Sequence, residues 1–159
     1  MWLGLIKQYN LEKNMLSDNF SGIPIEDIHI GMYALYTQTI TDADIKIFSG
    51  VSGDKNPIHM CDEYAQRSRY KKRIAHGMML ASYFSSLFGT KLPGHGSIYV
   101  SQSLNFKRPI YIDDTVTVKV EVADVNLIKR RVYFKTTCSV KSKVVIDGVA
   151  EIYIPLVKG

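Results

Sequence analysis

The sequence predicts an α+β domain in which an antiparallel sheet packs against one long apolar helix. Two observations carry this prediction. Residues 76–89 are apolar nearly all round, and from residue 97 onward apolar and polar residues alternate in four segments. A helix without a polar face must be covered by other structure, and alternating strands present one face to a core. With 159 residues, of which 46% are hydrophobic, the chain is long enough to bury one such core.

The elements before the apolar helix are short. We expect an N-terminal extension over residues 1–18 and a single domain over residues 19–159. Alternating aromatic and β-branched residues predict a strand at Met32–Ile40. Thr41 and Asp44 then have the spacing of a capping box, which predicts a helix through about Ser49. A second short helix is predicted at residues 62–69.

The apolar helix and the strands after it make up most of the predicted core. Gly89 suits the C-terminal end of a helix that begins near His76. The period-two segments predict four strands, at residues 97–106, 115–122, 130–140 and 143–156. A sheet of this kind curved around one buried helix is the hot-dog arrangement, which the order of the elements suggests.

Composition narrows the function classes. The net charge of +5 is a modest excess, and the basic residues are scattered without a helix-turn-helix or RNA-binding signature, so we expect no nucleic-acid partner. The two cysteines do not make a disulfide framework, and no apolar run is long enough to cross a bilayer. We therefore expect a cytoplasmic protein with reduced thiols that is not embedded in a membrane.

The segment Asp54–His59, with the sequence DKNPIH, is the first candidate site. Pro57 fixes its own φ and pushes Asn56 toward an extended conformation, so the chain must bend here. A bend lets a carboxylate and an imidazole converge on one water molecule and exchange protons with it. The alternative is purely structural: Asp54 and Asn56 would form turns, and His59 would cap the next helix.

The pair His76-Gly77 is the second candidate site, because it stands at the start of the apolar helix. The first N–H groups of a helix lack intrahelical acceptors, and the helix dipole favours negative charge there. The amide of Gly77 could therefore stabilise negative charge that develops on the oxygen of a bound carbonyl group. The alternative is a helix start that needs a glycine for close packing.

The spacing of these motifs resembles that of MaoC-like (R)-specific enoyl-CoA hydratases, which have the hot-dog fold. The pattern D-x-N-P-x-H at 54–59 is followed by H-G-M at 76–78, A-S-x-F-S at 81–85 and P-G-x-G-S-I-Y at 93–99. The similarity extends from about Met32 to Pro155. It implies addition of water to a trans-2-enoyl thioester, giving an (R)-3-hydroxyacyl thioester, or the reverse dehydration.

The resemblance also implies residue roles. Asp54 and His59 would activate water, Gly77 would bind the thioester carbonyl, and Asn56 and Ser85 would support the pair. Contacts with the substrate are expected from four further residues: His76, Met78, Lys107 and Arg108. The substrate would be a coenzyme A or acyl-carrier-protein thioester, with no metal and no cofactor, and the active form would be a homodimer in fatty-acid or polyhydroxyalkanoate metabolism.

Two alternative functions remain open from the residues alone. A hot-dog acyl-CoA thioesterase would usually place a carboxylate on or near the central helix, and residues 76–89 contain serines but no carboxylate. A non-catalytic acyl-CoA-binding module is compatible with the positive charge. We also expect Tyr83 and Phe84 to lie beside the acyl pocket, where their bulk would favour short chains.

Overall fold

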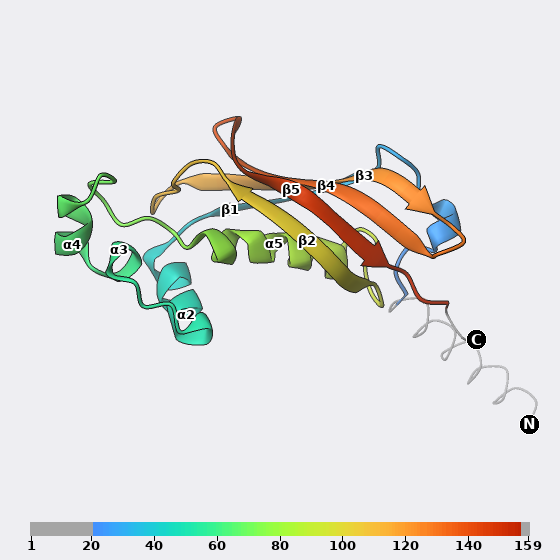
Figure 1. The fold of residues 1–159 in the computed structure, drawn as a ribbon, viewed down its shortest axis with the longest axis horizontal. Coiled ribbons are helices and arrows are strands. Elements are labelled where there is room, and N and C mark those ends of the chain that lie inside the picture. The colour runs from blue at the N-terminus through green and yellow to red at the C-terminus, as the bar shows by residue number, and fades with distance from the viewer. Residues whose placement is uncertain (1–20, 157–159) are drawn as a thin grey trace, which may run out of the picture.

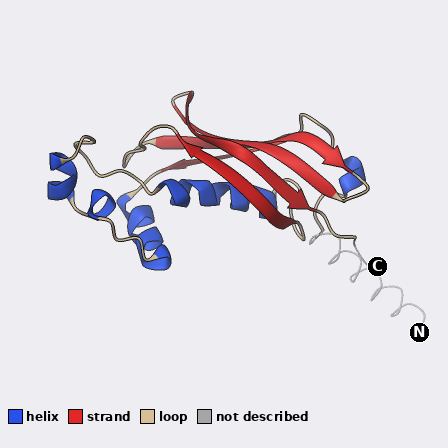
Figure 2. Ribbon diagram, viewed as in Figure 1, coloured by secondary structure: helices blue, strands red, loops and turns tan. Residues whose placement is uncertain are grey.

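The computed structural model describes residues 21–156, so the predicted extension at residues 1–18 lies outside the described residues. A five-stranded antiparallel sheet lies over α5 (Gly77–Thr90), which runs along one face (Figures 1 and 2). The sheet order is β1-β3-β4-β5-β2. Its strands are β1 (Tyr33–Thr39), β2 (Ile98–Phe106), β3 (Thr115–Asn126), β4 (Arg131–Val140) and β5 (Lys143–Tyr153). The hot-dog architecture predicted from the sequence is confirmed.

The alternation of buried apolar and outward-facing polar residues along a strand explains how the strands pair. In β3, Val116, Val118, Val120 and Val122 are all buried, while the threonines, lysine and glutamate between them face outward. A shift of one residue in register would turn the valines toward solvent, so burial of one face fixes the pairing. All five predicted strands are present, and their ends differ from the predictions by a few residues.

The helices that carry the first motif gather beyond the sheet, at the N-terminal end of α5 (Figure 1). They are α2 (Asp42–Ser52), α3 (Pro57–Met60) and α4 (Asp62–Arg67), and a 3₁₀ turn (Ile25–Asp27) precedes β1. The capping box is present: the hydroxyl of Thr41 accepts from the amide of Asp44, whose carboxylate accepts from the amide of Thr41. Helix α2 continues past the predicted end at Ser49, because the chain leaves the helix only at Gly53, which is left-handed with φ of 76°.

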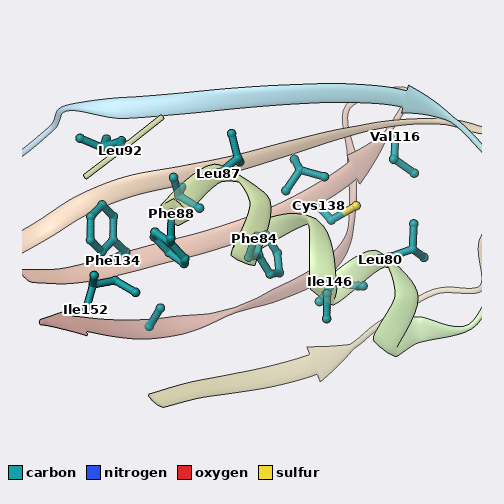
Figure 3. Close-up of a cluster of buried hydrophobic side chains, with 14 of the residues drawn as sticks. Leu80, Phe84, Leu87, Phe88, Leu92, Val116, Phe134, Cys138, Ile146 and Ile152 are labelled. Atoms are coloured by element: carbon teal, nitrogen blue, oxygen red, sulfur yellow. The ribbon is translucent and has the colours of Figure 1, made fainter. Parts of the chain in front are cut away.

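The core lies between α5 and the sheet (Figure 3). Leu80, Phe84, Leu87 and Phe88 point from the helix into the cluster of buried side chains, and the ring of Phe88 packs at 4.8 Å from that of Phe134. The prediction that α5 would be enclosed on all sides is correct for this face only. The opposite face, with Met78, Ser82, Ser85 and Ser86, is exposed, because the sheet covers a single side of the helix.

Within residues 21–156, no helix has both the length and the apolar character that crossing a bilayer would require. The two cysteines are free, Cys61 at the surface and Cys138 in the core. Burial raises the pKa of the Cys138 thiol to about 12, so this thiol serves as a small core residue.

Candidate active site

The bend that carries Asp54 is built from local hydrogen bonds. The hydroxyl of Ser52 accepts from the amide of Asp54 at 3.1 Å, and Oδ1 of Asp54 accepts from the amide of Asn56 at 3.1 Å. Oδ1 of Asn56 in turn accepts from the amide of Ile58 at 3.2 Å and caps α3, with Pro57 in the first helical turn. The turn and capping roles of Asp54 and Asn56 are therefore real. They leave Oδ2 of Asp54 available for chemistry.

Asp54 and His59 face each other across this bend. Oδ2 of Asp54 lies 4.0 Å from Nε2 of His59. Nδ1 of His59 lies 2.8 Å from the backbone oxygen of Ile74, and because a carbonyl only accepts, Nδ1 carries the proton. The lone pair of His59 is then on Nε2, the atom that faces the carboxylate. A separation of 4.0 Å is too long for a direct hydrogen bond and suits a water molecule between the two groups.

The environment of His59 keeps its imidazole neutral. Burial lowers the pKa of His59 from its ordinary value, and the neighbouring His76 adds to the decrease. The bond to Ile74 and the carboxylate of Asp54 act in the opposite direction without cancelling it. Since a neutral imidazole can accept a proton at Nε2, His59 is suited to act as a base at neutral pH.

His76 lies directly behind the pair and is only 2% exposed. Its Nε2 lies 3.0 Å from the backbone oxygen of Asp54, and its ring stacks on that of His59 with 3.9 Å between the ring centroids. The ring of Phe48 packs against it at 5.0 Å. The structure thus places His76, predicted as a substrate contact, mainly in contact with the two candidate catalytic residues.

Gly77 is the first residue of α5, so its amide belongs to the turn whose N–H groups lack intrahelical acceptors. A Cβ atom at this position would lie 2.6 Å from a ring carbon of Phe106, which rules out any larger side chain without movement of that ring. The close-packing interpretation of Gly77 is therefore confirmed. Its role as a donor to a carbonyl oxygen stays a prediction, which its position in the first turn of α5 favours.

A cavity of about 470 Å³ joins these groups, and its wall includes Asp54, His59, His76 and Gly77. Leu80, Ile110 and Ile146 supply apolar surface to it, and Met78, Lys107 and Arg108 from the predicted set also line it. The structure therefore brings together every predicted site residue except Asn56, which acts from behind the bend, and Ser85.

The residues of the cavity wall that were not predicted from the sequence include Arg69, Tyr70 and Phe106. Arg69 and Tyr70 lie on the loop after α4, and the guanidinium of Arg69 donates to the hydroxyl of Tyr70 at 2.5 Å. Nothing in the spacing of the sequence motifs pointed to this loop. Phe106 ends the predicted strand at residues 97–106 and directly precedes Lys107, a predicted substrate contact. This position was the only sequence signal for Phe106.

The cationic side chains around the cavity differ in whether a carboxylate neutralises their charge. Lys107 forms an ion pair with Asp147, whereas Arg108 donates to the backbone oxygen of Val144 and Arg69 to a tyrosine hydroxyl. Among the residues that line the cavity, Asp54 is the only carboxylate. The rim is therefore positive, which favours an anionic part of a ligand.

Arg73 has a structural role near the site. It forms ion pairs with Asp42 at 2.7 Å and Asp62 at 2.8 Å, and it is 12% exposed. These bonds tie the first turns of α2 and α4 together. Arg73 thus stabilises the group of helices that carries the bend.

Ser85, Tyr83 and Phe84 lie away from this cavity. Ser85 is exposed on α5, eight residues beyond Gly77, which is roughly 12 Å along a helix. Its predicted supporting role stays a prediction. Phe84 is fully buried in the core and Tyr83 packs against Tyr36, so neither lines the cavity that contains Asp54. The expectation that they lie beside the acyl pocket stays a prediction. On a helix, residues six and seven positions beyond Gly77 are more than a full turn away.

The same site contains a possible set of metal ligands. Asp54, His59 and His76 each offer one ligand atom, and these atoms lie within 4.8 Å of one another. However, each histidine uses one ring nitrogen on a backbone carbonyl, and the remaining nitrogen of His76, Nδ1, is fully buried. The donor set therefore fits a metal poorly.

Comparisons with known proteins agree with this geometry. The family model described as "MaoC like domain" matches residues 28–144. The (R)-specific enoyl-CoA hydratase of Rhodospirillum rubrum is 49% identical over 82% of this chain and 90% of that protein. The 3-hydroxybutyryl-CoA dehydratase of Methylorubrum extorquens is 42% identical over 82% and 83%. Among solved structures, the (R)-hydratase from A. caviae involved in PHA biosynthesis superposes with a TM-score of 0.79 at 35% identity, covering 81% of this chain and 98% of the other.

Proposed function

This chain belongs to the MaoC-like domain family, and from that premise we propose that it hydrates trans-2-enoyl-CoA to (R)-3-hydroxyacyl-CoA and catalyses the reverse dehydration. The observation that carries the proposal is the 4.0 Å separation of Asp54 Oδ2 and His59 Nε2 in a cavity that also contains the start of α5. The enzyme is a hydro-lyase, like the hydratase and dehydratase relatives.

In the proposed reaction, a water molecule binds between Asp54 and His59. Its oxygen bonds to C3 of the enoyl group as one O–H proton moves to the pair, where Nε2 of His59 carries the accepting lone pair. The π electrons of the C2–C3 bond shift toward the thioester carbonyl and leave negative charge on its oxygen. The pair then returns one proton to C2, so the enzyme ends unchanged, and no cofactor or metal takes part.

In this scheme the N–H of Gly77 donates a hydrogen bond to the thioester carbonyl oxygen. A donor fixed at the start of a helix is already oriented when the charge develops, so it stabilises the transition state more than the ground state. Removal of one such donor typically slows a reaction by about 10²–10³. The ring of Phe106, which is 54% exposed at the cavity wall, gives the acyl chain an apolar surface.

The phosphates of the thioester carrier would bind at the positive rim. Arg69 and Arg108 have no carboxylate partner among the contacts described above, while Lys107 is paired with Asp147. We therefore assign the main electrostatic contribution to the two arginines and a smaller one to Lys107. Met78, which is 57% exposed at the cavity, would contact the pantetheine arm.

We further propose that two copies pair through β2. This strand lies at an edge of the sheet and exposes four large apolar side chains: Ile98, Tyr99, Val100 and Phe106. An edge with open backbone groups and apolar side chains readily pairs with another strand, and a two-fold dimer is the commonest soluble assembly. The reaction would take place in the cytoplasm, in fatty-acid or polyhydroxyalkanoate metabolism.

The direct test is turnover of crotonyl-CoA, followed as loss of absorbance at the enoyl thioester band, with chiral analysis of the product. The expected product is (R)-3-hydroxybutyryl-CoA. Release of free thiol from the same substrate would instead support a thioesterase. Binding without either reaction would support a non-catalytic module.

A further inference from the structure

His76 contacts both members of the Asp54–His59 pair, and the reaction scheme above gives it no part. We propose that His76 is a positioning residue: it holds the carboxylate and the imidazole in reactive register without itself touching the substrate. This inference rests on the proposed function. It changes the role expected of His76 from the sequence, which was a substrate contact.

The first contact fixes the bend. Nε2 of His76 lies 3.0 Å from the backbone oxygen of Asp54, a residue 22 positions earlier in the chain. The bend itself is exposed, and its other bonds are local ones to Ser52 and Asn56. The bond from His76 therefore connects the bend to the start of α5. It holds the backbone of Asp54 next to the residue that directly precedes Gly77.

The second contact fixes the imidazole. The rings of His59 and His76 stack with 3.9 Å between centroids and 29° between planes, and Phe48 covers His76 at 5.0 Å. One edge of the His59 ring is already held by its bond to Ile74. The stack on His76 restrains the ring plane as well, so that Nε2 of His59 stays directed at the carboxylate.

The hydrogen bonds require opposite tautomers in the two stacked histidines. Both acceptors are backbone carbonyls, so His59 carries its proton on Nδ1 and His76 carries its proton on Nε2. Nδ1 of His76 is buried and has no hydrogen-bond partner in the part of the chain that the structure describes. The ring of His76 therefore has a single N–H donor, on Nε2, and this N–H points at the backbone oxygen of Asp54.

The consequence is a selective effect on the chemical step. A displacement of about 1 Å in a catalytic group can slow a reaction about 100-fold, while substrate binding depends on the rest of the cavity. Loss of the His76 contacts should therefore lower kcat by about ten- to 100-fold and change KM for crotonyl-CoA by less than about threefold.

Two substitutions separate the contacts. His76→Gln keeps an N–H that can reach the oxygen of Asp54 but removes the ring, and His76→Phe keeps a ring for the stack but removes the donor. We expect a partial rescue of kcat by the glutamine relative to the phenylalanine. His29, which is exposed and lies outside the cavity, provides matched controls, since His29→Gln and His29→Phe should leave kcat unchanged.

A measurement on the unmodified protein avoids the risk that a variant misfolds. Long-range ¹⁵N–¹H correlation spectra should show Nε2–H on His76 and Nδ1–H on His59. Wild-type kcat in His76→Phe, a raised KM with unchanged kcat, or an Nδ1–H tautomer at His76 would each overturn the proposal. If the unmodified protein hydrates no enoyl thioester, the proposed function fails instead, and the tautomers still report whether His76 holds the pair.

Discussion

Oδ2 of Asp54 and Nε2 of His59 face each other at 4.0 Å, and the imidazole carries its lone pair on the facing atom. The two groups come from opposite sides of a bend that Asn56 and Pro57 shape. This relationship explains why a segment rich in turn-forming residues also carries chemistry. The bend places the two groups so that one water molecule beside them can hydrogen-bond to both.

Asp54→Asn should reduce kcat for crotonyl-CoA by about 10²–10⁴-fold, the range typical of a lost acid–base group. The asparagine keeps an oxygen that can accept from the amide of Asn56, so the bend should survive and the melting temperature should change little. Glu63→Gln is the matched control, because Glu63 is exposed on nearby α4. Turnover that persists in Asp54→Asn would refute the mechanism.

The pH dependence should follow the lowered pKa of His59. Because burial disfavours the charged ring, kcat/KM should hold as the pH falls through about 6.5, the ordinary histidine value, and decline only at lower pH. A decline centred above 6.5 would contradict this assignment.

The same shift predicts how stability depends on pH. Below about 6.5 the unfolded chain protonates this histidine while the folded chain does not, so unfolding takes up a proton. The stability from His59 is thus fully present above the unfolded pKa and is lost as the pH falls toward the folded pKa. Denaturant unfolding of the protein and of His59→Gln at several pH values would reveal the difference.

Gly77→Ala should lower activity more than stability. The added Cβ meets the ring of Phe106 at 2.6 Å, but that side chain is 54% exposed and can move, so the ring would shift into the cavity beside the amide. We expect a loss of at least about tenfold in kcat/KM. Gly89→Ala on the same helix meets nothing within 4 Å and should keep full activity, with a gain of about 0.4–1 kcal/mol in stability. Equal effects of the two substitutions would argue against a role for the Gly77 amide.

Arg69→Ala and Arg108→Ala should each raise KM for crotonyl-CoA by about three- to tenfold and leave KM for crotonyl-pantetheine, which has no phosphate, unchanged. Lys107→Ala should have a smaller effect because Asp147 already balances its charge. Arg67→Ala is a control, since Arg67 pairs with Glu63 and lies outside the cavity. A matching assay with a crotonyl-carrier-protein would show which carrier the rim prefers. Equal losses on both small thioesters would exclude phosphate recognition.

Val100→Lys should convert a dimer to a monomer in light scattering, because Val100 is 43% exposed on the edge strand β2 and a charge there opposes strand pairing. Ile128→Lys, in the turn after β3 where the side chain is 97% exposed, should leave the mass unchanged. A monomeric unmodified protein would refute the proposed assembly.

The sequence by itself determined the strands, the central helix and the two motifs of the site. Val116–Val122 alternate so regularly that only one register buries the valines, and Asp54–His59 has a spacing that forces a bend through Pro57. These are local properties, set by the chirality and the polarity of neighbouring residues. They can therefore be predicted from the sequence of each segment.

Tertiary structure decided what lies across from each motif. His76 gains its bond to the Asp54 backbone and its stack on His59 only because the start of α5 packs against the bend. Arg69 reaches the cavity wall only because the loop after α4 folds back toward α5. It also directs Phe84 into the core and Tyr83 toward Tyr36, so neither side chain lines the cavity that contains Asp54. Contacts between residues far apart in the chain depend on how whole elements pack, and a single sequence carries no local signal for them.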